Sequence, residues 1–153
     1  MVDEVFTCLC RDFAKDSIVV QTSIPEDLQV DCVPIQMEQV LMNLVLNARD
    51  AMLPGGGILK IVAGEDGDQV SITVSDTGRG IPPEHLPDIF RPFFTTKTQK
   101  DRPAGSNSGS GVGLAFCRRI VDAHQGQIDV ASQPGKGSSF TIRLPRKPSH
   151  DRL

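Results

Sequence analysis

The sequence predicts an α+β fold in which helices cover one face of a mixed, mostly antiparallel sheet. Apolar residues recur with the period of a helix in two long segments, and they alternate with polar residues in pairs of short segments. Strands that neighbour each other in the sequence tend to pair, and the apolar faces of the helices must be buried against them. The 153 residues suit one domain. We expect this domain over residues 1–145, with a polar tail over 146–153.

The first half of the chain should hold two helices and two strands. The expected elements are, in order, an amphipathic helix over 3–16, strands over 19–22 and 29–31, and a long helix over 36–53. The long helix ends at the turn Pro54-Gly55-Gly56-Gly57.

The second half should hold two hairpins separated by a loop and a helix. The expected elements are strands over 58–63 and 69–75 around a turn at 64–67, a short helix over 83–89, a helix over 113–124, and strands over 128–131 and 138–144. Residues 91–112 are poor in apolar side chains and read as a long mobile loop. Long loops in small domains are usually functional or disordered.

Composition excludes several functions. The net charge is −3 and both Trp and Tyr are absent, so we expect no nucleic-acid partner. The four cysteines form no C-x-x-C pair, which argues against zinc and against a disulfide framework; buried thiols are expected instead. No apolar run reaches membrane length, and a cytoplasmic location is expected, although a parent protein could still be membrane-anchored.

The long helix carries a polar stripe beside its apolar face. At about 100° per residue the apolar side chains fall in one arc of about 140°, namely Met37, Val40, Leu41, Leu44, Val45, Ala48, Ala51 and Met52. The adjoining stripe holds Gln36, Gln39, Asn43, Asn47 and Asp50, while Glu38 and Arg49 face outward. Asn is a poor helix former, so this stripe suggests a pocket, and amide oxygens suit Mg²⁺ beside phosphate oxygens. A solvated surface is the alternative.

Asp76 follows an alternating strand and shares the parity of Val70, Ile72 and Val74. It should therefore point toward the helix layer, where a carboxylate is costly unless it is hydrogen-bonded. Gly78 and Gly80 follow it and would allow a ligand to approach the backbone closely. An Asp that caps its own turn is the alternative.

A glycine-rich segment, Gly109-Ser110-Gly111-Val112-Gly113-Leu114, opens the second long helix. Helix N-termini attract phosphate through free N–H groups and the helix dipole. The segment lacks the Lys-Ser or Lys-Thr of a Walker A loop, and no strand precedes it as in a Rossmann fingerprint.

Five segments, in this order, resemble the motifs of the GHKL superfamily of ATPases, and most closely those of histidine kinases of the nitrogen-regulation type. They are Gln39–Met52 (N box), Asp76–Ile81 (first glycine box), Pro92–Lys97 (phenylalanine box), Gly109–Leu114 (second glycine box) and Gly135–Phe140 (closing glycine motif). The resemblance implies the Bergerat fold, a two-layer α/β sandwich, with residues 91–112 as an ATP lid. It also implies ATP and Mg²⁺ as cofactors.

The resemblance also implies roles for individual residues. Asn47 would coordinate Mg²⁺, Asn43 would lie near the phosphates, and Asp76 would accept the hydrogen bond of the adenine amino group. The remaining contacts with the nucleotide would come from Gly78, Gly80, Ile81, Phe93, Phe94, Lys97, Gly109, Gly111, Val112, Gly113, Leu114 and Ser138. Many sensor kinases carry Lys or Arg where this chain has Asp50, so Lys97, Arg49 or Arg102 would supply the charge at the γ-phosphate.

The implied reaction is transfer of the ATP γ-phosphate to a histidine on a separate dimerisation domain, with a response regulator downstream. Asn43 occupies the place where hydrolysing relatives carry a glutamate base, so Asn43 and Lys97 are the candidate catalytic residues. The alternatives are a serine kinase of the anti-sigma type, an ATP hydrolase, and a non-catalytic nucleotide sensor.

The three histidines, His85, His124 and His150, lack the long-helix context of a phosphate acceptor. His124 should instead be a cation favoured by its helix C-terminus. The chain alone is therefore expected to bind ATP as a monomer without phosphorylating itself.

Overall fold

The computed structural model describes residues 13, 15–25, 32–91 and 113–145. Several expectations lie outside these residues: most of the helix over 3–16, the strand over 29–31, the loop from residue 92 to 112, and the tail over 146–153.

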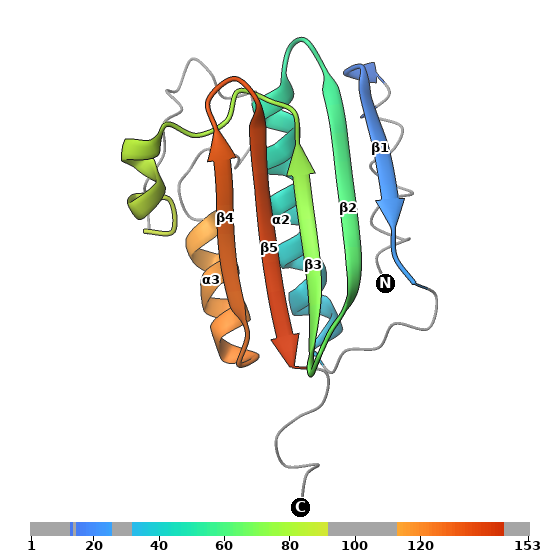
Figure 1. Ribbon diagram of the computed structural model, residues 1–153, viewed down its shortest axis with the longest axis vertical. Helices are drawn as coiled ribbons and strands as arrows, with labels where there is room; N and C mark the ends of the chain where they lie inside the picture. Colours follow the sequence, from blue (N-terminus) through green and yellow to red (C-terminus); the bar gives the residue numbers. More distant parts are fainter. Residues whose placement is uncertain (1–12, 14, 26–31, 92–112, 146–153) are drawn as a thin grey trace, which may run out of the picture.

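Five strands form one sheet in the order β1-β2-β3-β5-β4 (Figure 1). Their bounds are β1 Ile18–Ser23, β2 Gly57–Asp66, β3 Gln69–Asp76, β4 Gln127–Gln133 and β5 Gly137–Pro145. Strand β1 runs parallel to β2, and the other neighbours are antiparallel. The predicted mixed, mostly antiparallel sheet is therefore confirmed.

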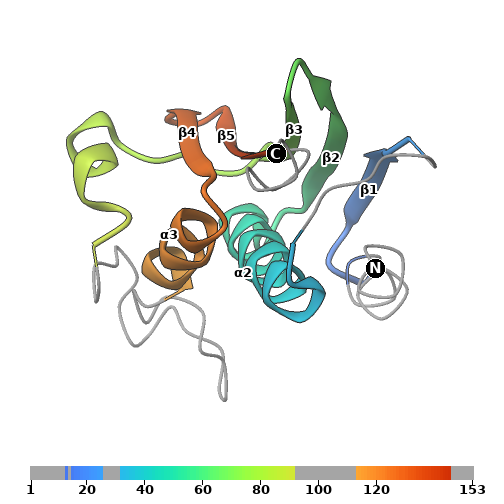
Figure 2. The same cartoon turned by 90° about the horizontal axis from the view of Figure 1, so that it is seen from below.

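Two helices, α2 (Pro34–Met52) and α3 (Gly113–Ala123), lie side by side on the same face of the sheet (Figure 2). A short 3-10 helix, η1 (Pro83–Asp88), follows β3. Helix α2 begins two residues before the predicted start because Pro34 occupies its first turn. A backbone N–H at that position has no partner within the helix, so proline, which has no N–H, is tolerated there. The two-layer arrangement predicted from the resemblance is confirmed. None of the helices in the described residues is long and apolar enough to cross a membrane.

The turn between β2 and β3 is shorter than predicted. Strand β2 continues to Asp66, which pairs with Gln69, so only Gly67 and Asp68 remain in the turn. The predicted turn over 64–67 is wrong because Gly67, with φ +63°, supplies the left-handed conformation that a two-residue hairpin loop requires. Gly64 and Glu65 stay in the ladder instead.

The predicted apolar face of α2 forms the centre of the core. Seven of its eight side chains are buried, and Ala51 is half-buried. The fully buried side chains of α2 pack with those of the inner face of the sheet, including Leu59, Ile61, Val70, Val74, Ile142 and Leu144. This burial fixes the rotation of α2, and therefore the direction of its polar stripe.

Candidate functional site

The polar stripe of α2 meets the first turn of α3. A Cβ placed on Gly113 would lie 3.7 Å from both Cγ and Oδ1 of Asn43. One turn later, the thiol of Cys117 donates to the carbonyl oxygen of Val40 at 3.7 Å. The N-terminus of α3 thus faces the middle of α2, where the side chains of Asn43 and Asn47 are half-buried. Free N–H groups at a helix start favour an anion, so this junction can receive a phosphate group.

Cys117 is fully buried at this junction. Burial raises the pKa of its thiol to about 12, although a hydrogen bond with the Asn43 side chain opposes the shift. The thiol therefore stays protonated and packs as a small apolar group. The expectation of buried thiols is confirmed for Cys117, whereas Cys32 is only half-buried.

Asp76 ends β3 and points into the helix layer, as its parity predicted. Its exposed fraction is 8%, and its Oδ1 accepts a hydrogen bond from the backbone N–H of Gly78 at 2.9 Å. Burial raises the pKa of this carboxyl, while backbone hydrogen bonds from Gly78 and Ser138 and the charge of Arg79 oppose the rise. Asp76 does cap its own turn, and it is also a buried acceptor at one end of the sheet.

A row of three polar side chains crosses the inner face of the sheet at this end. Asp76 pairs with Ser138 across β3 and β5, and Ser138 pairs with Ser132 across β5 and β4. Asp76 and Ser138 are the two buried polar side chains among the described residues. Ser132 was not predicted as a site residue, although the alternation of Ile128 and Val130 in β4 gives it the inward parity.

The loop after Asp76 packs against the C-terminal end of α2. The backbone N–H of Arg79 donates to the carbonyl oxygen of Ala51 at 3.0 Å, and Ile81 N–H donates to Ser132 Oγ at 2.7 Å. Both predicted glycines are constrained there. A Cβ on Gly78 would overlap the Ala51 carbonyl, and Gly80, with φ +73°, closely faces Gln133. Gly78, Gly80 and Ile81 therefore lie together beside Asp76.

Gly78→Ala should lower the free energy of unfolding by about 1–3 kcal/mol, since an overpacked backbone contact must shift. Gly113→Ala is the matched control because its added methyl group would meet Asn43 at an ordinary contact distance. Urea titration monitored by circular dichroism measures both variants. Equal destabilisation of the two would contradict the packing described for Gly78.

Aromatic side chains border this region where the described segment ends at Arg91. Phe90 packs edge-on against Phe140, with ring centroids 6.3 Å apart, and Arg118 of α3 lies 5.7 Å from the centroid of the Phe90 ring. Leu114 and Ile81 also pack against the core. The other predicted contacts, namely Phe93, Phe94, Lys97, Arg102, Gly109, Gly111 and Val112, lie outside the described residues.

Two charged residues of α2, whose roles at the γ-phosphate the sequence did not decide, also have defined neighbours. Arg49 Nε lies 2.6 Å from Asp16 Oδ2, just before β1. The carbonyl oxygen of Asp50 accepts from Arg79 at 3.5 Å. Arg49 is thus engaged near the β1 edge of the sheet, whereas α3 lies at the β4 edge (Figure 1).

The expectation of a cationic His124 is wrong. Its Nε2 accepts the backbone N–H of Val33 at 3.0 Å, and its Nδ1 lies 2.8 Å from the carbonyl oxygen of Ile120. A backbone N–H can only donate and a carbonyl oxygen can only accept, so the ring is the neutral Nδ1–H tautomer. His124 links the end of α3 to the start of α2.

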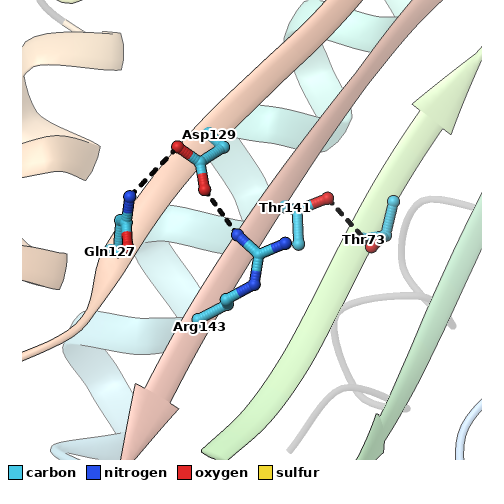
Figure 3. Close-up of polar contacts among 5 residues, drawn as sticks. All are labelled: Thr73, Gln127, Asp129, Thr141 and Arg143. Carbon is cyan, nitrogen blue, oxygen red and sulfur yellow. Dashed lines mark hydrogen bonds and ion pairs between the residues drawn. The ribbon is translucent and has the colours of Figure 1, made fainter. Parts of the chain in front are cut away.

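The outer face of the sheet has a different character, and none of the helices in the described part of the chain covers it (Figure 2). Thr73 and Thr141 form a hydroxyl pair at 3.1 Å, and Asp129 bonds with Arg143 and with Gln127 (Figure 3). These polar side chains bond with one another. Those predicted ligand-binding residues that the structure describes lie instead on the side of the sheet that α2, α3 and the loop after β3 cover.

The family model of the histidine kinase-, DNA gyrase B- and HSP90-like ATPases matches residues 32–148. Among characterised proteins, the sensor histidine kinase ZraS of Escherichia coli K12 is 45% identical over 123 residues, which cover 80% of this chain and 24% of ZraS. Sporulation kinase A of Bacillus subtilis 168 is 36% identical over 148 residues, or 96% of this chain and 23% of that kinase. The chain thus spans about a quarter of the length of these relatives.

Solved structures are similar over nearly the whole chain. The catalytic domain of histidine kinase ThkA has a TM-score of 0.81 and 34% identity, covering 95% of this chain and 90% of that domain. A structure of ThkA in complex with the response regulator TrrA has a TM-score of 0.77 and 31% identity, covering 96% of this chain and 40% of that one.

Proposed function

The chain belongs to the family of histidine kinase-, DNA gyrase B- and HSP90-like ATPases and is the ATP-binding catalytic domain of a sensor histidine kinase, and from this premise we propose how its residues hold ATP and use it. The observation that carries the proposal is the buried carboxylate of Asp76 at the polar end of a largely apolar sheet face. A buried acceptor of this kind suits an amino group presented by a flat, apolar ring.

The nucleotide lies along α2. Its adenine contacts Asp76 and the loop containing Gly78, Gly80 and Ile81, which packs beside Ala51. Its phosphates lie near Asn43, Asn47 and the start of α3 at Gly113. Ala51 follows Asn43 by eight positions, which corresponds to about 12 Å along a helix, a span that ribose and phosphates can bridge. Leu114 and Ser138 complete the described walls, and Phe93, Phe94, Lys97, Gly109, Gly111 and Val112 are proposed to contribute from the lid.

Mg²⁺ would be held by Asn47 together with phosphate oxygens. The described residues contain no group of three or more His, Cys, Asp or Glu side chains that could hold a metal, so a cage made of protein alone is absent from this part of the chain. The half-buried amide of Asn47 beside a phosphate-accepting helix start fits a cation that binds through one protein ligand and the substrate. Bound there, Mg²⁺ would neutralise phosphate charge.

Asn47→Ala should remove most of the dependence of ATP affinity on Mg²⁺, with a loss of about tenfold in the presence of the metal, the size of one lost charge-assisted contact. Calorimetric titration with ATP, with and without Mg²⁺, measures this. Gln39→Ala, on an exposed position of the same stripe, is the control. An Asn47 variant with an undiminished response to Mg²⁺ would contradict the assignment.

The proposed reaction transfers the γ-phosphate to a histidine of a separate dimerisation domain. Transfer of this kind depends on positioning and on charge neutralisation. Asn43 cannot act as a base, so it orients the phosphates without activating water, and Lys97, which lies outside the described residues, is proposed to contact the γ-phosphate. Neither His85 nor His124 is a suitable acceptor, because His85 lies half-buried in η1 and both ring nitrogens of His124 are engaged.

Labelled ATP tests this reaction. The chain alone should acquire no label, whereas a histidine-bearing dimerisation domain supplied in trans should acquire an acid-labile one. An acid-stable label on a partner would favour the serine kinase alternative, and release of phosphate without a partner would favour the hydrolase. Stoichiometric phosphohistidine on the chain alone would overturn the proposed division of labour. In the proposed reaction sequence, the phosphohistidine of the dimerisation domain passes its phosphate to a response regulator, which is a partner of the whole protein.

A further inference from the structure

We infer that Ser132 is a positioning residue that makes the Ser138 hydroxyl a hydrogen-bond acceptor, so that the nucleotide pocket selects a 6-amino purine over a 6-oxo purine. This inference rests on the proposed binding of ATP. It concerns a residue that lies two strands beyond Asp76 in the sheet, with Ser138 between them, and is not itself assigned to the site.

Ser132 Oγ lies at the centre of three hydrogen bonds. It accepts from Ile81 N–H at 2.7 Å, donates to the carbonyl oxygen of Gly137 at 3.0 Å, and lies 2.9 Å from Ser138 Oγ. The Gly137 carbonyl can only accept, so the single proton of Ser132 is committed to it. All three bonds can therefore coexist only if Ser138 donates its own proton to Ser132.

This proton arrangement determines what Ser138 offers to a ligand. With its proton turned toward Ser132, the Ser138 oxygen presents only lone pairs on its remaining side. The neighbouring Asp76 side chain also accepts when it is ionised, and the two residues pair across β3 and β5. The 6-amino group has two N–H donors, one for each of these buried acceptors. A 6-oxo purine offers on that edge only its single N1–H beside an acceptor oxygen, so an acceptor that faces this oxygen is left unsatisfied.

The same hydroxyl holds the shape of the pocket. Ile81 N–H follows the Gly78–Gly80 segment, and Gly137 begins β5, so Ser132 ties the loop after β3 to the β4–β5 turn. Simple loosening of this tie would weaken every purine nucleotide alike. Loss of the proton arrangement instead has an opposite effect on a 6-oxo ligand, since a released Ser138 hydroxyl can rotate and donate to it.

Calorimetric titration with ATP and with ITP, its 6-oxo counterpart, separates these effects. Wild type should prefer ATP. Ser132→Ala should lower that preference by about three- to tenfold, the value of one hydrogen bond, without lowering the affinity for ITP. Ser132→Thr, which keeps the hydroxyl, should retain the preference. Ser139→Ala should also retain it, because Ser139 bonds with Ser75 on the outer face at 3.0 Å.

If Ser132→Ala does not fold, as judged by thermal unfolding, the nearly isosteric Ser132→Cys variant replaces it, since a thiol is a weak donor and acceptor. An unchanged preference for ATP in the folded variant would overturn the role of Ser132, as would a wild type that binds ATP and ITP equally. In the first case the proposed ATP site would stand. The second case would also contradict the proposed contact between Asp76 and the adenine amino group, although nucleotide binding itself would remain. A wild type that binds neither nucleotide would overturn the proposed function and, with it, this inference.

Discussion

Replacing Asp76 with Asn should lower the affinity for Mg²⁺-ATP by about a hundredfold, since a buried hydrogen bond to a charged acceptor is worth up to about 3 kcal/mol. The shape of the side chain is kept, and its remaining oxygen can still accept the Gly78 N–H, so the loop should stay in place. What changes is that an NH₂ group replaces one acceptor oxygen and faces the adenine amino group. Calorimetric titration of wild type and variant measures the loss.

The same substitution should not destabilise the fold at neutral pH. The pKa of Asp76 is raised in the folded state, chiefly by burial, so the folded protein binds a proton more readily than the unfolded chain does. Ionisation of Asp76 therefore costs stability, and that cost is present above the folded pKa and is relieved as the pH falls through it. Asp76→Asn removes this cost, and its advantage in unfolding free energy should shrink as the pH falls toward the unfolded value of 3.8.

Asp129→Asn is the matched control for both measurements. Asp129 is a carboxylate of β4 that pairs with Arg143, and both side chains are partly exposed. Its replacement should leave ATP affinity unchanged. Equal loss of affinity in the two variants would show that Asp76 acts through net charge rather than through contact with adenine.

Leu44→Ala should lower the free energy of unfolding by about 3 kcal/mol, within the usual range for a Leu truncated in a core. Leu44 is fully buried on the apolar face of α2, within the core cluster that also holds the inner side chains of the sheet. Such a loss is a large part of the stability of a small domain. Leu46, which is half-buried on the same helix, provides the control, and Leu46→Ala should cost clearly less.

Urea titration at constant temperature compares the two Leu variants. At urea concentrations where Leu44→Ala remains folded, its ATP affinity should stay close to that of wild type, because Leu44 supports α2 without facing the nucleotide. A Leu44 variant as stable as the Leu46 variant would mean that the rotation of α2 differs from the one described.

The sequence predicted the features that follow from local periodicity. The period of α2 placed Leu44 in the core and Asn43 and Asn47 beside it, and the alternation in β3 turned Asp76 inward; both are confirmed by burial. The lining of the nucleotide site by these residues remains a prediction. The extra strand residues at Gly64 and Glu65 were missed because the pairing energy of two antiparallel strands exceeded the local turn preference of that segment.

Contacts between distant segments could not be predicted in this way. Ser132 binds Ile81 across 51 residues, and His124 binds Val33 across 91. Only the tertiary fold brings these groups together, and only the identity of the partner decides whether His124 is neutral or charged. The parallel pairing of β1 with β2 is likewise non-local, since α2 lies between them in the sequence.

Titration of the isotope-labelled domain with a non-hydrolysable ATP analogue and Mg²⁺, followed by amide NMR, locates the nucleotide directly. The proposed site predicts the largest shifts at Asn43, Asn47, Asp76, Gly78, Gly80 and Gly113. Little change is expected at Thr73, Thr141 and Asp129 on the outer face of the sheet. Shifts concentrated on that outer face, or no shifts at saturating analogue, would contradict an ATP site between α2, α3 and the loop after β3.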